Sequence, residues 1–240
     1  MTKPLTKIFI LLLLSGFFYY LFSVIVLPVK SYTIDPRLET VQFFVPTKTD
    51  VNGLSIREVK KQLQNNGKQV TLVMNGGMYN PLFQPVGLTI INGKIIQSIV
   101  TKTSGFGNFF LQPNGIFLIT NTGDAKIVTT QDFAQENIDE INYATQSGPL
   151  LVTDNKINEL FTIGSENREI RNGVCVLENG QMVFAISRHP INFYDFASFF
   201  KDKGCINALY LDGSISKAYI PSQFFNTDGN VGMVITSVKK

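Results

Sequence analysis

Hydrophobic residues are distributed in two different ways along this chain. Residues 8–27 form one unbroken run of uncharged, mostly apolar residues, whereas beyond residue 30 the apolar runs are short, rich in Val, Ile and Phe, and separated by turn residues. Twenty residues at about 1.5 Å rise each would span roughly 30 Å as a helix, the thickness of the hydrocarbon core of a bilayer. The pattern therefore predicts a signal anchor or transmembrane segment over residues 1–30 and a domain over residues 31–240.

The apolar run is interpreted as an uncleaved signal anchor. Lys3 and Lys7 precede it, so the positive-inside rule keeps the N-terminus in the cytoplasm. A cleaved signal peptide is the main alternative, but its apolar region has about 7–15 residues and ends in a small-x-small site, which this sequence lacks. A buried core helix is the third interpretation, and the lack of a polar face disfavours it. We expect a single-pass membrane protein with its domain on the extracytoplasmic side, periplasmic or extracellular.

Most of the domain has the pattern of β-strands. Asn92-Gly93 and Asn179-Gly180 each separate two apolar runs. Asn-Gly is the strongest short-range hairpin signal, because both residues tolerate the positive φ of a type I′ turn. Asp154-Asn155 predicts a third hairpin, and the apolar run 70–74 predicts a buried strand.

Two segments have helical patterns. In residues 54–67, Ser55 and Glu58 have the spacing of a capping box. In residues 192–204, Asn192 can cap a helix whose phenylalanines share one face, and a third helix is possible near 131–138. Few helices among many strands, without βαβ alternation, predict an α+β fold. We expect a mixed, largely antiparallel sheet with a few packed helices, preceded by the N-terminal transmembrane helix.

Composition excludes several classes of protein. His189 is the only histidine, which rules out any site that needs two. Cys175 and Cys205 form no CxxC motif and lie in apolar segments, so two buried thiols are the default and a disulfide stays open. Residues 31–238 carry 16 basic and 18 acidic side chains, so no basic footprint for nucleic acid exists. We expect no cofactor, and no metal is assigned because no calcium-loop pattern is present.

Four segments combine glycine with polar residues at the ends of apolar strands, which is where a ligand site can form. They are residues 75–80 (NGGMYN), 146–149 (QSGP), 171–173 (RNG) and 211–214 (LDGS). Each could be an ordinary turn when taken alone. The phosphate-loop, GxGxxG and GxSxG patterns are absent, which disfavours a nucleotide-binding protein or a serine hydrolase.

Taken together, these segments resemble the phosphodiester glycosidase family, and most closely its bacterial, membrane-anchored branch. The similarity runs from about residue 31 to 222 and is carried by MNGGMYNPLFQPVGLTIINGK, GNFFLQPNGIF, ATQSGPLLV, IRNGV and INFYDFASFFKDKGCINALYLDGSIS. The chain departs from the family at LDGSIS, where Ile215 replaces a residue that is often small. The resemblance implies hydrolysis of a glycosyl phosphodiester in the cell envelope, with a sugar-phosphate or cell-surface polysaccharide as substrate.

The matched motifs supply candidate residues for that reaction. A carboxylate is useful at the anomeric carbon because the transition state resembles an oxocarbenium ion, and Asp212 is the candidate. Arginine binds phosphate through a planar, permanently charged fork, so Arg171 is the candidate clamp. The remaining candidates are predicted to bind substrate: Asn75, Gly76, Gly77, Ser147, Gly148, Asn172, Arg188, Gly213 and Ser214.

Two other functions stay open. A non-catalytic module that binds saccharide or polymer would have the same fold, and the altered LDGSIS segment favours it. A structural envelope protein would have no convergent site at all. The sugar, the stereochemistry and the oligomeric state are not predicted.

Overall fold

The computed structural model describes residues 28–47 and 50–240. The predicted signal anchor lies outside these residues. Within the two described ranges, no helix is both long enough and apolar enough to cross a membrane. The first strand begins at Val29, two residues before the predicted start of the domain.

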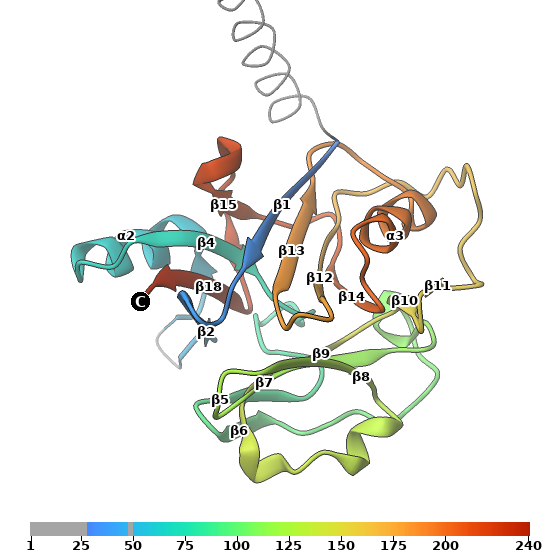
Figure 1. Ribbon diagram of the computed structural model, residues 1–240, viewed down its shortest axis with the longest axis horizontal. Helices are drawn as coiled ribbons and strands as arrows, with labels where there is room; N and C mark the ends of the chain where they lie inside the picture. Colours follow the sequence, from blue (N-terminus) through green and yellow to red (C-terminus); the bar gives the residue numbers. More distant parts are fainter. Residues whose placement is uncertain (1–27, 48–49) are drawn as a thin grey trace, which may run out of the picture.

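The described chain folds into three larger β-sheets and one strand pair, and every paired strand is antiparallel (Figure 1). The α+β, largely antiparallel class is confirmed, but the strands divide among several sheets. The first sheet has the order β1 (Val29–Ile34), β13 (Met182–Ser187), β12 (Asn172–Val176), β14 (Asn207–Asp212), β10 (Leu150–Thr153) and β11 (Lys156–Ile157).

The other sheets flank this one. The second has the order β16 (Phe225–Asn226), β15 (Ala218–Ile220), β4 (Val70–Asn75), β18 (Val234–Lys239) and β2 (Glu39–Phe44). The third has the order β6 (Lys94–Gln97), β5 (Thr89–Ile91), β9 (Ile141–Ser147), β7 (Gly115–Thr120) and β8 (Ala125–Thr129), and it lies lowest in Figure 1. Strands β17 (Asn230–Val231) and β3 (Leu54–Ser55) form the separate pair.

One hydrophobic core joins the three larger sheets. Phe43, Phe117 and Phe184 come from the second, third and first sheet respectively, and all three are buried. The ring of Phe117 lies 6.0 Å from that of Phe43 and 5.7 Å from that of Phe184, measured between centroids. The ends of strands from different sheets are therefore held in fixed positions relative to one another.

Both predicted α-helices are present. Helix α2 (Ile56–Asn65) begins at Ser55, whose hydroxyl accepts from the backbone N–H of Glu58 at 3.2 Å, and it packs on β4. Helix α3 (Phe193–Asp202) begins at Asn192, whose side chain accepts from the N–H of Asp195 at 2.8 Å, and it packs on β10 and β11. The possible third helix near 131–138 is not an α-helix. That segment forms short 3₁₀ turns, η2 (Asp132–Gln135) and η3 (Ile138–Glu140), and similar turns are η1 (Asn108–Phe110) and η4 (Pro221–Gln223).

The three predicted hairpins are confirmed, but one turn differs from the expectation. Asn92 and Gly93 have φ values of 50° and 73°, and Asp154 and Asn155 have 49° and 61°, as a type I′ turn requires. In the third hairpin only Gly180 has a positive φ, of 80°. The N–H of Leu177 donates to the carbonyl of Gln181, so three residues form this loop and glycine takes its left-handed position.

Cys175 and Cys205 form a disulfide, with their Cα atoms 5.9 Å apart. The default expectation of two buried thiols is therefore wrong. Cys175 lies in β12 and Cys205 lies between α3 and β14. The disulfide therefore joins the connection between α3 and β14 to β12, the neighbour of β14 in the sheet. The two cysteines are close because β12 and β14 pair, and sequence spacing alone does not show this.

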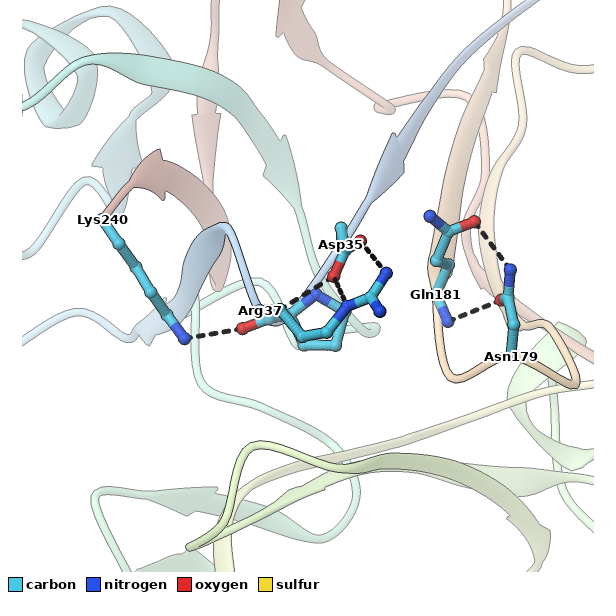
Figure 2. A network of polar contacts seen from close by, with 6 residues as sticks. Asp35, Arg37, Asn179, Gln181 and Lys240 are labelled. Carbon is cyan, nitrogen blue, oxygen red and sulfur yellow. Dashed lines mark hydrogen bonds and ion pairs between the residues drawn. The ribbon is translucent and has the colours of Figure 1, made fainter.

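Polar contacts fix the C-terminus to the turn that joins β1 and β2 (Figure 2). Asp35 accepts from the backbone N–H of Arg37 at 2.9 Å and from its Nε at 2.8 Å. The Nζ of Lys240 donates to the carbonyl of Pro36 at 2.7 Å. Asn179 and Gln181 bond to each other in the adjacent β12–β13 turn. These contacts are structural and lie away from the site described below.

Candidate functional site

Three strand ends from two sheets meet at one buried polar group. Asp212 is the last residue of β14 and pairs with Asn172, the first residue of β12. Asn75 is the last residue of β4 in the second sheet. Its Nδ2 donates to Oδ2 of Asp212 at 3.3 Å, and Nδ2 of Asn172 donates to Oδ1 of Asn75 at 3.1 Å. The structure thus brings together three of the predicted site residues, of which Asn75 and Asp212 are 137 residues apart in the sequence.

Hydrogen bonds fix the orientation of the Asn75 amide. Its Oδ1 accepts from Asn172 and also from the backbone N–H of Lys217, at 2.9 Å. Because the oxygen faces two donors, the Nδ2 group must face Asp212. Nδ2 of Asn172 also donates to the backbone carbonyl of Asn75 at 2.8 Å. The carboxylate of Asp212 therefore has a positioned donor on one side.

Asp212 is a buried carboxyl with few partners. The residue is 7% exposed, and its other oxygen accepts from the backbone N–H of Gly213 at 2.7 Å. In the described part of the chain no cation forms an ion pair with it. Burial raises the pKa of Asp212 to about 7, and the bonds from Gly213 and Asn75 only partly oppose that rise. Such a carboxyl can both accept and release a proton near neutral pH.

Ser216 belongs to this group and was missed by the sequence analysis. Its buried hydroxyl lies 2.6 Å from the carbonyl of Gly213 and 3.2 Å from Oδ1 of Asn172. It closes the turn after Asp212 and supports the asparagine that orients Asn75. Its position at the end of LDGSIS was the available signal, whereas Ser214 in the same motif is exposed.

Arg171 precedes Asn172 but is fully buried with its side chain on a different set of partners. Nε donates to the carbonyl of Ile191 at 2.8 Å, and Nη2 donates to the carbonyl and side chain of Asn167 at 3.0 and 2.9 Å. The guanidinium carbon lies 3.6 Å from the ring centroid of Phe193. Because Nη1 donates to the hydroxyl of Tyr210, all three guanidinium nitrogens already donate within the protein. The phosphate clamp stays a prediction that these contacts do not favour.

Tyr210 links Arg171 to the strand of Asp212. Nη1 of Arg171 donates to the Tyr210 hydroxyl at 3.2 Å. Tyr210 and Asp212 are two residues apart on β14, but they pair with the adjacent residues Gly173 and Asn172, because the register shifts between them. Burial raises the pKa of Tyr210 above its ordinary value, and the neighbouring charge of Asp212 adds to this while Arg171 opposes it.

Tyr79 is a second tyrosine that the charge of Asp212 influences. Burial, together with the nearby charge of Asp212, raises the pKa of Tyr79 to about 12. Gly232 packs directly against Tyr79, since a Cβ at that glycine would lie 2.4 Å from the tyrosine Cβ. Tyr79 is in the NGGMYN motif but was not chosen as a candidate.

The backbone N–H groups of the two glycine motifs differ in availability. That of Gly76 donates to the carbonyl of Met233 at 2.9 Å, and that of Gly213 donates to Asp212. For Gly77 and Ser214 no acceptor is found among residues 28–47 and 50–240. These two N–H groups each lie two residues beyond the contact between Asn75 and Asp212, so they are the better candidates for an anion.

The remaining predicted residues do not join this group. Ser147 is buried and its hydroxyl donates to the carbonyl of Leu211 at 2.8 Å, which supports β14 from β9. Gly148 has no room for a side chain, since a Cβ would lie 2.7 Å from Cβ of Asn114. The backbone N–H of Arg188 donates to the carbonyl of Pro28 at the start of β1.

The two described ranges contain no cluster of side chains that is arranged as a metal site. No group of three or more His, Cys, Asp or Glu side chains within them is arranged to hold a metal ion. The groups that donate to the carboxylate of Asp212 are the side-chain amide of Asn75 and the backbone N–H of Gly213.

Solved structures with the same fold are known. The chain superposes on the zebrafish N-acetylglucosamine-1-phosphodiester alpha-N-acetylglucosaminidase (NAGPA) catalytic domain, auto-inhibited by its pro-peptide, with a TM-score of 0.56 and 14% identity, covering 88% of this chain and 83% of that one. A hypothetical protein from Synechocystis gives a TM-score of 0.58 at 13% identity, covering 88% and 59%. A putative exported protein from Burkholderia pseudomallei K96243 gives 0.58 at 11% identity, covering 87% and 73%.

The chain thus shares its fold with the zebrafish NAGPA catalytic domain. The family model for phosphodiester glycosidases matches residues 68–235, and the chain belongs to that family. The uncharacterized protein YigE of Escherichia coli (strain K12) is 36% identical over 196 residues, which cover 81% of this chain and 75% of YigE. The resemblance found in the sequence is confirmed.

Proposed function

We propose that this protein hydrolyses a glycosyl phosphodiester in the cell envelope, with Asp212 acting at the anomeric carbon. Family membership supports a role in glycosyl phosphodiester hydrolysis in general. One observation carries the assignment to Asp212: its carboxyl is buried without a cationic partner and is held between the side chain of Asn75 and the backbone N–H of Gly213. A carboxyl that is buried for structural reasons is usually paired with a cation or accepts several hydrogen bonds.

In this proposal Asp212 accepts a proton from the attacking water. The water oxygen bonds to the anomeric carbon, the bond from that carbon to the phosphate oxygen breaks, and the products are the free sugar and a phosphomonoester. A general base works best when its pKa is close to the working pH, and that of Asp212 is about 7. Its negative charge also stabilises the oxocarbenium-like transition state. Phosphate leaves without needing a strong acid.

The phosphate would be held by the backbone N–H groups of Gly77 and Ser214. Neither N–H has an acceptor in the described ranges. Arg171 would act as a positioning residue, because its guanidinium is engaged by Ile191, Asn167 and Tyr210. Through the bond to Tyr210 it fixes the strand that ends at Asp212. Asn75 would hold the carboxyl, and Asn172 would in turn hold Asn75.

The location in the envelope rests on the predicted anchor of residues 8–27, preceded by Lys3 and Lys7. Surface polysaccharides and teichoic-type polymers contain sugar-phosphate linkages and are the substrates proposed for an extracytoplasmic enzyme. A reporter fused after residue 240 tests the orientation. Alkaline phosphatase activity, which requires export, is expected, and fluorescence of a cytoplasm-only reporter would contradict it.

The test of activity uses the purified full-length protein with a panel of sugar-1-phosphodiesters, including UDP-N-acetylglucosamine. Mass spectrometry should detect a free sugar and a phosphomonoester with the wild type and none with Asp212→Asn. Asp202→Asn is the matched control, since Asp202 is exposed at the end of α3. Full activity of Asp212→Asn, or no turnover on the whole panel, would overturn the proposal. Binding of saccharide without turnover would instead support the non-catalytic module.

A further inference from the structure

A short segment between β6 and β7, residues 106–110 (FGNFF), is held in place by buried contacts. Phe109 is 3% exposed and supports the segment from within. A Cβ at Gly87 would lie 2.8 Å from Cε2 of Phe109, and a Cβ at Gly148 would lie 2.8 Å from its carbonyl oxygen. The same carbonyl accepts from Nδ2 of Asn114 at 3.2 Å. Two glycines thus leave room for the segment, and its position is fixed against the QSGP motif.

Asn108 connects this segment to the Asp212 site. Its side chain lies beside the hydroxyl of Tyr210, which also accepts from Arg171. That hydroxyl is close to the turn after Asp212, since a Cβ at Gly213 would lie 2.8 Å from it, and the N–H of Gly213 donates to the carboxylate of Asp212. Tyr210 and Arg171 are fully buried, whereas Asn108 is partly exposed. Asn108 is therefore a polar side chain of this group that a bound ligand can reach.

Phe106 is fully exposed, and its neighbours hold the backbone on both sides. A Cβ at Gly105 would lie 2.5 Å from two ring carbons of Phe110, so Gly105 packs against that ring. Gly107 has a φ of 94°, which side chains disfavour, and its carbonyl accepts from the N–H of Phe110 at 3.3 Å. The Cα atoms of Phe106 and Asn108 are at most about 7 Å apart, because only two peptide units join them. Single exposed apolar residues are normal on a surface, so it is this position beside Asn108 that points to a function.

The residue types of the segment suit a sugar better than a phosphate. Residues 106–110 carry no charged side chain. The amide of Asn108 can both donate to and accept from a hydroxyl, and a sugar presents hydroxyls around the edge of its ring. The faces of a sugar ring carry C–H groups that pack on an aromatic ring such as that of Phe106. An aromatic face also stabilises the positive charge that develops at the anomeric carbon in the transition state.

We propose that residues 106–110 bind the sugar of the substrate, with Asn108 bonded to one sugar hydroxyl and Phe106 packed on a face of the sugar ring. The inference rests on the proposed function, which puts a glycosyl group at Asp212. It makes Asn108 and Phe106 determinants of specificity. The protein then selects its substrates by the sugar ring and by one particular hydroxyl of that ring.

The first test places a fluorescent reporter in the segment. The chain has no tryptophan, so Phe106→Trp gives an emission signal from this position alone and keeps an aromatic ring there. Glucose, galactose and N-acetylglucosamine 1-phosphate are titrated into the full-length variant, with inorganic phosphate for comparison. A saturable blue shift is expected with at least one sugar phosphate, because the sugar covers an exposed indole, and none is expected with inorganic phosphate. Leu38→Trp is the matched control and should not respond, since Leu38 is also exposed but lies in the β1–β2 turn away from the site.

The second test asks whether Asn108 contacts a sugar hydroxyl. Asn108→Ala is added to Phe106→Trp, circular dichroism checks that the fold is kept, and Kd is measured for the best-bound sugar phosphate and its monodeoxy forms. Loss of one uncharged hydrogen bond should raise Kd roughly threefold to tenfold. For the deoxy form that lacks the contacted hydroxyl, both proteins should bind equally, because the partner of Asn108 is already gone. If Asn108 only supported Tyr210, its loss would weaken the binding of every form by the same factor.

The outcomes separate this inference from the proposed function. No shift with any of the three sugar phosphates, an equal shift with inorganic phosphate, or an equal shift in Leu38→Trp would overturn the inference. An equal loss with every deoxy form would overturn the contact assigned to Asn108. Turnover of diesters by the wild type without a response of Phe106→Trp would overturn the inference and leave the enzyme in place. A sugar-dependent response in a protein that turns over no diester would support the sugar site and overturn the proposed hydrolysis.

Discussion

Glu39 and Asp212 are both buried carboxyls, and their surroundings differ in the way that separates a structural group from a reactive one. Glu39 is 4% exposed and accepts from Tyr32, Thr71, Ser237 and Lys239 at 2.6–2.9 Å. Asp212 accepts from one amide and one backbone N–H. Burial alone would raise the pKa of Glu39, but the bonds from Lys239, Thr71, Ser237 and Tyr32 hold it below its ordinary value. For Asp212 the burial effect dominates.

This difference shows how the fold divides its roles. Glu39, in β2, joins its strand to three others. Its donors are Tyr32 in β1, Thr71 in β4, and Ser237 and Lys239 in β18. It stays ionised and stabilises the second sheet. Asp212 is kept short of donors at the junction of two sheets, which reduces stability and leaves a carboxyl able to exchange protons near neutral pH.

The largest expected effect is that of Asp212→Asn on turnover. Removing the carboxyl should lower kcat by about 10³-fold or more, as expected for a group that moves a proton and stabilises charge in the transition state. Initial rates on the best substrate of the panel measure this. A loss of less than about tenfold would place Asp212 with Glu39 as a structural residue.

The two carboxyls should affect stability with opposite dependence on pH. Because the pKa of Asp212 is raised in the folded state to about 7, ionisation costs stability as pH rises from the unfolded pKa of about 4 to 7, and the cost is constant above that. Relative to the wild type, Asp212→Asn should therefore gain about 2–4 kcal/mol between pH 4 and 8. Urea unfolding at several pH values measures the gain. A difference that does not change with pH would contradict the raised pKa.

Glu39→Gln should show the reverse. The folded pKa of Glu39 is lowered, so its stabilisation is present above the unfolded pKa of about 4.3 and is lost as pH falls through the folded value. At pH 7 we expect a loss of about 1–3 kcal/mol in the free energy of unfolding, because charge-assisted bonds are replaced by neutral ones. The kcat of the folded variant should stay within about twofold of the wild type. A large loss of kcat without a loss of stability would break the comparison.

The smallest expected effect is that of Ser216→Ala. Ser216 touches Asn172 and closes the turn after Asp212 but does not contact the carboxyl. We expect kcat to fall roughly threefold to tenfold with little change in KM, because the hydroxyl acts only by positioning. Ser104→Ala, in an exposed loop, is the matched control. An unchanged pH profile together with an unchanged kcat would remove Ser216 from the site.

Local chemistry made much of the fold predictable from sequence. The Ser55 and Asn192 caps and the Asn92-Gly93 and Asp154-Asn155 turns depend on neighbouring residues only, and all are present. The Asn179-Gly180 turn differed because loop length, set by pairing of the strands, decided which residue takes the positive φ. The division into several sheets and the bond between Cys175 and Cys205 depend on long-range packing that periodicity does not encode.

For the site, the motifs indicated the strand ends but not the directions of the side chains. The side chains of Asn75, Asn172 and Asp212 meet. The hydroxyl of Ser147 instead donates to the backbone of β14. The guanidinium of Arg171 donates to Asn167 and Ile191. Arg171 and Asn172 are adjacent, so on a strand they face opposite sides. That alternation, together with the register of β12 against β14, could have shown that the RNG motif cannot direct both the guanidinium of Arg171 and the amide of Asn172 toward Asp212.

If Asp212 is the reactive carboxyl, it titrates near neutral pH in the folded protein, and an NMR titration measures this. Protein labelled with ¹³C at the aspartate carboxyls is compared with the Asp212→Asn variant, which identifies the Asp212 signal by its absence. We expect this signal to titrate with a midpoint of about 7. A midpoint at or below about 4, the ordinary value for aspartate, would contradict it.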